Sequence, residues 1–260
     1  MQKIALCVGI NNYPGSGSDL QGCQNDVYDW AAELAARGFL VKTLLDFQAT
    51  RANIIANIKY LFSKTVSGDS LIIQFSGHGT RVPDESGDEA DGFDEALCPY
   101  DLPNLVYDDE IWALCKLKKP GVQLVFISDS CHSGSVVRAI SPAAAGRPRF
   151  LGFGSILSAF PLFQFREVRP LSEPFSDDGK SPWPMLLKGG CQDVEYSYDA
   201  VFNGRPNGAF TRTALDALKL LGPNATYADW HKAIRKKLPS RNYPQAPTLI
   251  GSYQSAKIFS

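Results

Sequence analysis

Two short stretches decide the fold of this 260-residue chain, LIIQFSGHG at 71–79 and QLVFISDSCHSG at 123–134. Each is an apolar run as long as a buried strand, and each ends abruptly in small and polar residues. The runs at 4–10 and 39–45 have the same apolar character. We expect the apolar runs at 4–10, 39–45, 71–75 and 124–128 to be buried strands of one sheet.

Helical patterns separate the expected strands. In the stretch 25–37, Val27, Trp30 and Leu34 recur at spacings of three and four, and similar patterns cover 50–63 and 108–117. Further candidate helices lie at 209–221 and 227–238, and a last strand at 248–252. This alternation predicts an α/β fold, with a mostly parallel central sheet and helices on both faces. Ligands of such sheets bind beyond the carboxyl ends of the strands.

We expect one domain over residues 1–260, in which a long insertion interrupts the pattern. From 133 to 184 the periodicity fades and prolines and basic residues accumulate. An irregular segment this long is unusual unless it has a function or is disordered, and a plain flexible connector remains an alternative. Regular patterns resume over 185–260.

Composition excludes several classes of protein. The net charge is −1, so nothing global favours nucleic acid or an anionic membrane. No apolar run is long enough to span a bilayer, and the first residues lack the order of a signal peptide. The six cysteines form no CxxC pair and are expected to be reduced thiols. We expect a cytoplasmic monomer.

Cys131 and His78 are the predicted catalytic pair. Each lies at the tip of an expected strand, and a thiol needs a base such as imidazole to become a good nucleophile. His132 is a competing base, but neighbours on an extended segment point to opposite faces. The backbone N–H groups of Gly79 and Cys131 are the candidates for holding an oxyanion.

Charge suggests what the site recognises. Asp129 lies two residues before Cys131, and Asp26 follows the first expected strand. A desolvated pair of carboxylates in the first subsite would favour Arg or Lys in the substrate. Asp26 could alternatively be a helix N-cap, and both roles are compatible.

The stretch from Asp84 to Glu110 contains eleven acidic residues and no Lys or Arg. Like charges repel, and a Ca²⁺ ion bound by carboxylate oxygens would relieve the repulsion. The alternative is a solvated acidic loop in which Asp108 caps the following helix.

Several motifs together resemble those of the metacaspases and prokaryotic orthocaspases, which are caspase-like peptidases of family C14. They are ALCVGINNYPG with GCQND, FSGHG, DGFDEALCPYD, DSCHSG, and GCQDVEYSYDA followed by GAFT. The cysteine motif is Ser-Cys-His-Ser-Gly, without the leading glutamine of true caspases, which favours a metacaspase.

This resemblance implies a caspase-like fold and a cysteine endopeptidase that cleaves proteins after Arg or Lys and is activated by Ca²⁺. Residues 1–132 would correspond to the large caspase subunit and 185–260 to the small one. The resemblance assigns the first subsite and the calcium ligands by position. The first-subsite residues are Cys23, Asp26, Ser76 and Asp129, and the calcium ligands are Asp91, Asp94, Asp108 and Asp109.

Self-cleavage within the insertion is a further hypothesis, since relatives of caspases can be cut after the nucleophile. The basic candidates are Arg147, Arg149, Arg166, Arg169 and Lys180. Three alternatives to a basic-specific peptidase remain: a noncatalytic caspase-like binding module, a related hydrolase acting after Asn or Asp, and, more remotely, a phosphate-binding α/β protein.

Overall fold

The computed structural model describes residues 1–83, 92–131, 146–162, 185–191 and 196–260. Its central sheet has the strand order β12-β9-β7-β3-β1-β2, and all neighbours are parallel except β12 and β9. The strands are β1 (Lys3–Gly9), β2 (Leu40–Leu45), β3 (Ser70–Ser76), β7 (Gln123–Asp129), β9 (Leu186–Gly189) and β12 (Ile250–Gly251). The expected strands are confirmed to within about two residues, the usual error at element ends.

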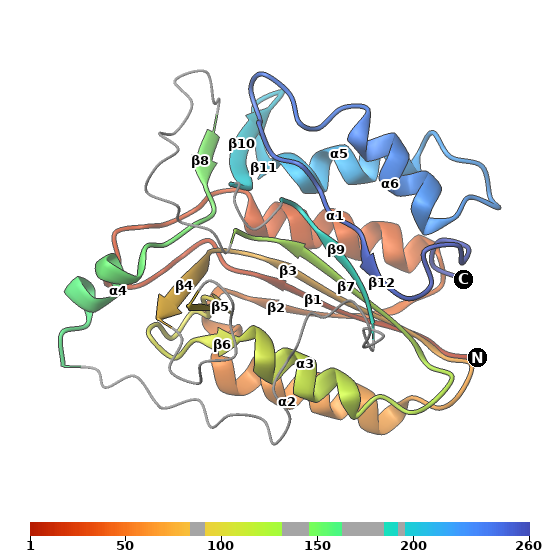
Figure 1. Cartoon of the computed structure of the whole chain (residues 1–260), viewed down its shortest axis with the longest axis horizontal. Coiled ribbons are helices and arrows are strands. Elements are labelled where there is room, and N and C mark those ends of the chain that lie inside the picture. Colours follow the sequence, from red (N-terminus) through yellow and green to blue (C-terminus); the bar gives the residue numbers. More distant parts are fainter. Residues whose placement is uncertain (84–91, 132–145, 163–184, 192–195) are drawn as a thin grey trace.

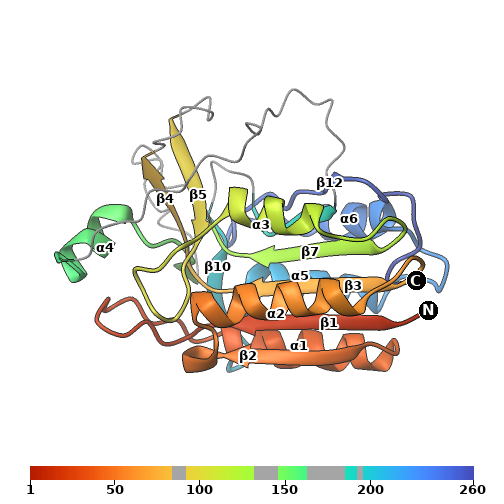
Figure 2. The same cartoon turned by 90° about the horizontal axis from the view of Figure 1, so that it is seen from below.

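Helices cover both faces of this sheet (Figure 1). The helices of the described residues are α1 (Cys23–Ala36), α2 (Arg51–Lys64), α3 (Asp108–Lys116), α4 (Phe153–Ala159), α5 (Ala209–Leu218) and α6 (Tyr227–Arg235), with the short 3₁₀ helix η1 (Asp46–Gln48). Figures 1 and 2 show α1, α5 and α6 on one face and α2 and α3 on the other. Separate apolar clusters fill these two layers, which confirms the α/β prediction.

Two small antiparallel sheets stand at the carboxyl ends of the central strands, and periodicity alone did not predict them. One contains β4 (Gly79–Pro83), β5 (Phe93–Leu97) and β6 (Val106–Tyr107), and the other β8 (Gly146–Pro148), β10 (Tyr198–Phe202) and β11 (Arg205–Gly208).

The prediction that 133–184 is irregular throughout is wrong where the structure describes it, because β8 and α4 lie there. A strand of three residues is too short to show periodicity. It exists because β10 supplies its hydrogen-bonding partners.

The register of the sheet brings the two motif-bearing tips together. Ser76 at the end of β3 is paired with Asp129 at the end of β7. His78 and Cys131 each follow their paired residue by two positions, so both lie at the carboxyl edge of the sheet. None of the helices in the described ranges is long and apolar enough to cross a membrane.

Candidate active site

A segment of the chain itself lies extended across the carboxyl edge of the sheet. Its first part, β8, pairs antiparallel with β10, and the N–H of Arg149 donates to the carbonyl of Ser197 at 2.8 Å. Its second part forms a parallel bridge between Phe150 and Gly79, and the N–H of Leu151 donates to the carbonyl of Gly79 at 2.9 Å. We call residues 146–151 the cleft segment. Its backbone is extended and hydrogen-bonded on both sides, as the backbone of a bound peptide would be.

The carbonyl oxygen of Arg149 accepts two backbone hydrogen bonds. One comes from the N–H of Gly79 at 3.0 Å and the other from the N–H of Cys131 at 3.2 Å. These are the two donors that the sequence suggested for an oxyanion. Here they converge on the carbonyl of a peptide bond in the cleft, which they polarise.

Cys131 is fully buried beneath the cleft segment. Its Sγ lies 3.3 Å from the carbonyl oxygen of Ser197 and also accepts a hydrogen bond from the Ser197 N–H. Cys131 therefore supplies both the thiol and one of the two N–H groups that bind the Arg149 carbonyl.

The contacts of His78 fix its tautomer. Its Nε2 lies 2.6 Å from the carbonyl oxygen of Ser18, and because a carbonyl can only accept, Nε2 carries the proton. Nδ1 is buried, with no hydrogen-bond partner among the described residues. Burial lowers the pKa of His78 to about 4, so the imidazole is neutral at pH 7 and Nδ1 presents a lone pair.

Tyr13 holds the histidine loop in place. Its hydroxyl accepts from the N–H of His78 at 2.8 Å and donates to the carbonyl of Cys98 at 3.3 Å. A Cβ on Gly77 would come within 2.6 Å of the Tyr13 hydroxyl oxygen. The glycine before His78 is therefore required by this close approach.

The side chain of Arg149 is enclosed by three carboxylates. Its Nη2 lies 2.7 Å from Asp26 and 3.0 Å from Asp199, and its Nη1 lies 3.2 Å from Asp129. The guanidinium and the Asp26 carboxylate are fully buried, and the others nearly so. A buried charge must be compensated in this way, so the pocket is built for a cation.

Backbone and side-chain donors hold each carboxylate. Asp26 accepts from the N–H of Gly208 at 2.8 Å, and Asp199 accepts from the N–H of Gly22 at 2.9 Å. Asp129 accepts from both the N–H and the hydroxyl of Thr211, at 2.9 and 2.7 Å. These donors fix the oxygen atoms before any cation arrives.

Three residues predicted for this pocket are Asp26, Ser76 and Cys23. The N-cap alternative for Asp26 is wrong, because α1 begins after Gly22 and Asp26 lies inside its first turn. Ser76 lies beside Asp129 in the sheet, but its hydroxyl accepts a hydrogen bond from Gln74 at 2.8 Å. Cys23 is buried, and its thiol is close enough to Arg149 for the guanidinium to oppose the rise in its pKa that burial causes.

The protonation of Asp26 depends on the Arg149 cation beside it. Burial raises the pKa of Asp26 to about 6, and the Arg149 guanidinium opposes this rise. The pKa of Arg149 lies well above its usual value, because the neighbouring carboxylates outweigh the effect of burial. The Asp26 carboxylate is therefore fully ionised only above about pH 6.

The sequence reasoning missed Asp199, Thr211 and the Ser18 carbonyl. The first two lay inside motifs already noted, SYDA and GAFT, but those motifs gave no role to single residues. Nothing in the sequence distinguishes a backbone carbonyl such as that of Ser18. His132 and Asp91 lie outside the described residues.

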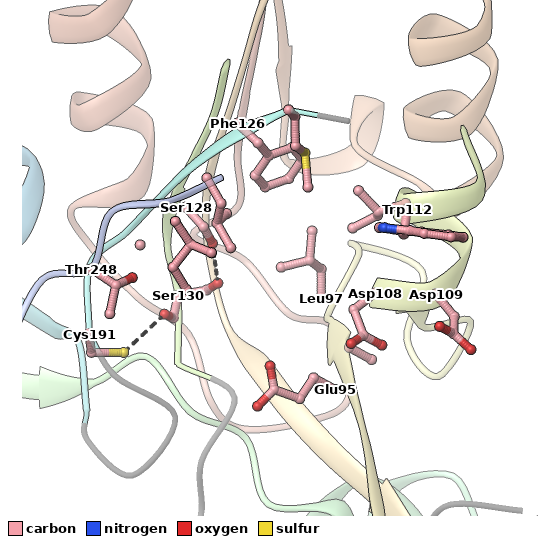
Figure 3. Close-up of a pocket in the computed structure, with 16 residues that line it drawn as sticks. Glu95, Leu97, Asp108, Asp109, Trp112, Phe126, Ser128, Ser130, Cys191 and Thr248 are labelled. Carbon is pink, nitrogen blue, oxygen red and sulfur yellow. Dashed lines mark hydrogen bonds between the residues drawn. The ribbon is translucent and has the colours of Figure 1, made fainter. Parts of the chain in front are cut away.

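A second pocket adjoins the site on the side of α3, with a volume of about 130 Å³ (Figure 3). Asp108, Asp109 and Glu95 line it together with apolar residues such as Trp112. Asp94 is not among the lining residues. In the described part of the chain, no three His, Cys, Asp or Glu side chains are grouped to hold a metal ion.

Comparison with known proteins gives the family. The sequence model described as "Metacaspase, peptidase C14 domain" matches residues 3–140. Metacaspase-1 of Coccidioides immitis is 33% identical over 97% of this chain and 62% of its own length. The chain belongs to the metacaspases. This confirms the resemblance, and the family is one of caspase-like cysteine peptidases.

Further similar proteins support the assignment of this chain to the metacaspases. Metacaspase-7 of Arabidopsis thaliana is 44% identical over 53% of the chain and 36% of its own length, so the chain spans only part of these curated relatives. The crystal structure of the Geobacter sulfurreducens protein GSU0716 aligns with this chain at a TM-score of 0.78 and 32% identity. The alignment covers 100% of this chain and 99% of the GSU0716 chain. Caspase-1 of Spodoptera frugiperda has a TM-score of 0.61 at 12% identity, covering 96% of this chain and 86% of its own, which confirms the caspase-like fold.

Proposed function

We propose that the chain is a cysteine endopeptidase that cleaves after Arg, and after Lys, through Cys131 and His78. The observation that carries the proposal is the placement of Arg149. Its guanidinium fills a buried acidic pocket while its carbonyl accepts from Gly79 and Cys131. A residue bound in this way is in the position of the one before a scissile bond.

The proposed reaction uses the free lone pair on His78. Nδ1 accepts the proton of the Cys131 thiol, and the thiolate attacks the carbonyl carbon of the bound arginine. The N–H groups of Gly79 and Cys131 stabilise the oxyanion. His78 then protonates the leaving amine, and water hydrolyses the thioester. The Ser18 carbonyl keeps the proton on Nε2, so Nδ1 remains the working atom.

Arginine fits the pocket better than lysine does. Its planar guanidinium offers separate N–H groups, and here Nη1 reaches Asp129 while Nη2 reaches Asp26 and Asp199. A lysine ammonium places its three N–H donors on one nitrogen and does not reproduce the separate positions of Nη1 and Nη2. We therefore expect both residues to be accepted, with Arg preferred.

The test is hydrolysis of Gly-Arg-Pro-Arg-aminomethylcoumarin beside peptides ending in Lys, Asp and Asn, with calcium and with chelator. We expect turnover after Arg and Lys by the wild type and none by Cys131→Ala. Cleavage only after Asp or Asn would refute the assignment of the acidic pocket. Binding of these peptides without cleavage would favour a noncatalytic module.

Calcium activation is part of the proposal. Its support is the acidic excess of residues 84–110, of which Asp108 and Asp109 face the second pocket with Glu95. Asp91 and Asp94 remain the other proposed ligands. Calcium would supply positive charge that lets these carboxylates approach one another.

Calorimetric titration with CaCl₂ tests calcium binding directly. We expect heat of binding that Asp108→Asn combined with Asp109→Asn removes and that Glu33→Gln on α1 leaves intact. Equal binding by both variants would exclude these ligands, and no binding by the wild type would exclude calcium as the activator.

Self-processing is proposed at the Arg149–Phe150 bond. Of the described candidates, Arg149 has the buried guanidinium, whereas the side chain of Arg147 is exposed. Arg166, Arg169 and Lys180 lie outside the described residues. The test is mass mapping of fragments after calcium addition. Cleavage of the Arg149–Phe150 bond should be absent in Arg149→Ala and in Cys131→Ala and should persist in Arg147→Ala.

A further inference from the structure

The chain anchors the residues after Arg149 as well as those before it. Leu151 is 4% exposed and belongs to the same apolar core as Ile54 of α2. Its N–H is bonded to Gly79, and five residues later Ile156 of α4 is fully buried in that core. The ring of Phe150 lies 6.0 Å from that of Tyr196.

The other side of the Arg149–Phe150 bond is held independently. β8 pairs with β10 through three residue pairs, and Arg149 is fixed by its buried ion pairs. If the bond were cut, the acyl group would be joined to Cys131 and the new amine of Phe150 would still be anchored through Leu151 and α4. Neither product would leave the site at once.

Water has little access to this arrangement. Cys131 is fully buried and His78 is 2% exposed with the cleft segment in place. A well-oriented tethered group reacts with an effective molarity of roughly 10⁵–10⁸ M, far above the molarity of water. The anchored amine is therefore the favoured nucleophile for the thioester.

We infer that this site also makes peptide bonds, rejoining Arg149 to Phe150 in competition with hydrolysis; this rests on the peptidase function proposed above. The amine of Phe150 attacks the Arg149 carbonyl of the acyl-enzyme, and a C–N bond forms as the C–S bond to Cys131 breaks. His78 takes the proton that the amine loses and returns it to the thiolate of Cys131. No oxidant, reductant or cofactor takes part.

Regulation of the site follows. While α4 stays docked, rejoining slows net cleavage of the Arg149–Phe150 bond, and the cleft segment acts as a tethered inhibitor that is consumed only slowly. Net cleavage requires the part after Arg149 to leave. Foreign peptides enter only when the cleft segment has moved away.

Hydroxylamine reveals the hidden acyl-enzyme, because it is small and attacks thioesters. The wild type is incubated with and without hydroxylamine at neutral pH, with calcium and with chelator, and analysed by intact mass. In each condition in which the coumarin peptide is cleaved, we expect hydroxylamine to speed the loss of intact chain. It attacks the thioester faster than water does, so it diverts a fraction of the acyl-enzyme from rejoining in every cycle. The new fragment should end in the hydroxamate of Arg149. Cys131→Ala controls for direct cleavage of Asn-Gly bonds by the reagent.

A pair of variants on α4 tests the anchor. Ile156→Ala loosens a fully buried residue, and Leu157→Ala changes its neighbour, which is 41% exposed. We expect Ile156→Ala to be cut after Arg149 in plain buffer, with little further gain from hydroxylamine, and Leu157→Ala to behave as the wild type. The hydroxylamine result on the wild type stands by itself if Ile156→Ala fails to fold.

The outcomes separate the two proposals. Coumarin release without any hydroxamate at Arg149 would overturn the rejoining inference and leave the peptidase function standing. The same holds if the wild type is hydrolysed in plain buffer as fast as Ile156→Ala. Absence of both coumarin release and hydroxamate would overturn both proposals.

Discussion

At the scale of single residues, the site places two groups with altered pKa values in different roles. His78 has a pKa of about 4 because it is buried, and Asp26 one of about 6 for the same reason. As pH falls from 7, Asp26 is therefore protonated first and the acidic pocket loses charge. The imidazole remains a neutral base until much lower pH.

This order of protonation predicts that a fall in pH weakens substrate binding before it slows turnover. As the pH falls from 7 toward 6 and below, the KM for Arg peptides should rise while kcat is maintained. Since the guanidinium already lowers the pKa of Asp26, the vacant pocket is protonated at a higher pH still. Steady-state kinetics from pH 5 to 8 measures both constants. A kcat that falls first, at unchanged KM, would contradict the order.

Gly208 gives a second prediction at this scale. A Cβ there would collide with a carboxylate oxygen of Asp129 and lie 2.6 Å from Nη1 of Arg149, too close for any side-chain carbon. Overpacking of this kind costs about 2 kcal/mol, so Gly208→Ala should lower kcat/KM for Arg peptides roughly thirtyfold. Gly222→Ala, where a Cβ would meet open space, is the matched control. Equal activity of the two variants would mean that the substrate binds elsewhere.

At the scale of elements, the first turn of α5 supports Asp129. Thr211 is fully buried and donates to this carboxylate through both its N–H and its hydroxyl. The helix N-terminus adds a favourable field for the negative charge. α5 thereby links the C-terminal part of the chain to the end of β7.

Thr211→Val should therefore destabilise the protein, because it leaves a buried carboxylate short of a donor. We expect a loss of about 1–3 kcal/mol in the free energy of unfolding, measured by denaturant titration. Thr213→Val on the same helix, where the side chain is half-buried, should change it little. A similar loss in both variants would point to packing instead.

Elements differ in how far sequence predicts them. The strands β1, β3 and β7 are long apolar runs, and their register alone brings Cys131 and His78 to one edge. β8 could not be predicted, since its three residues are ordered by pairing with β10. Arg149 was only one of several basic candidates, because the pocket that distinguishes it combines Asp26, Asp129 and Asp199 from distant positions.

At the scale of the whole molecule, the edge of the sheet bears on assembly. Of the two outer strands, β2 has six residues, whereas β12 has only two and offers few free backbone groups for pairing with another copy through its edge. We therefore predict a monomer, with light scattering after gel filtration as the measurement. A dimer mass at micromolar concentration would contradict this.

The enclosed Arg149 also affects the lifetime of the opened enzyme. When the cleft segment leaves, three carboxylates in the interior lose their cation, and uncoupling a buried ion pair costs about 3–5 kcal/mol. That is a large share of the 5–15 kcal/mol that keeps a typical domain folded. The opened form should thus be short-lived unless an arginine substrate restores the missing charge, so the supply of substrate would itself set how long the enzyme persists.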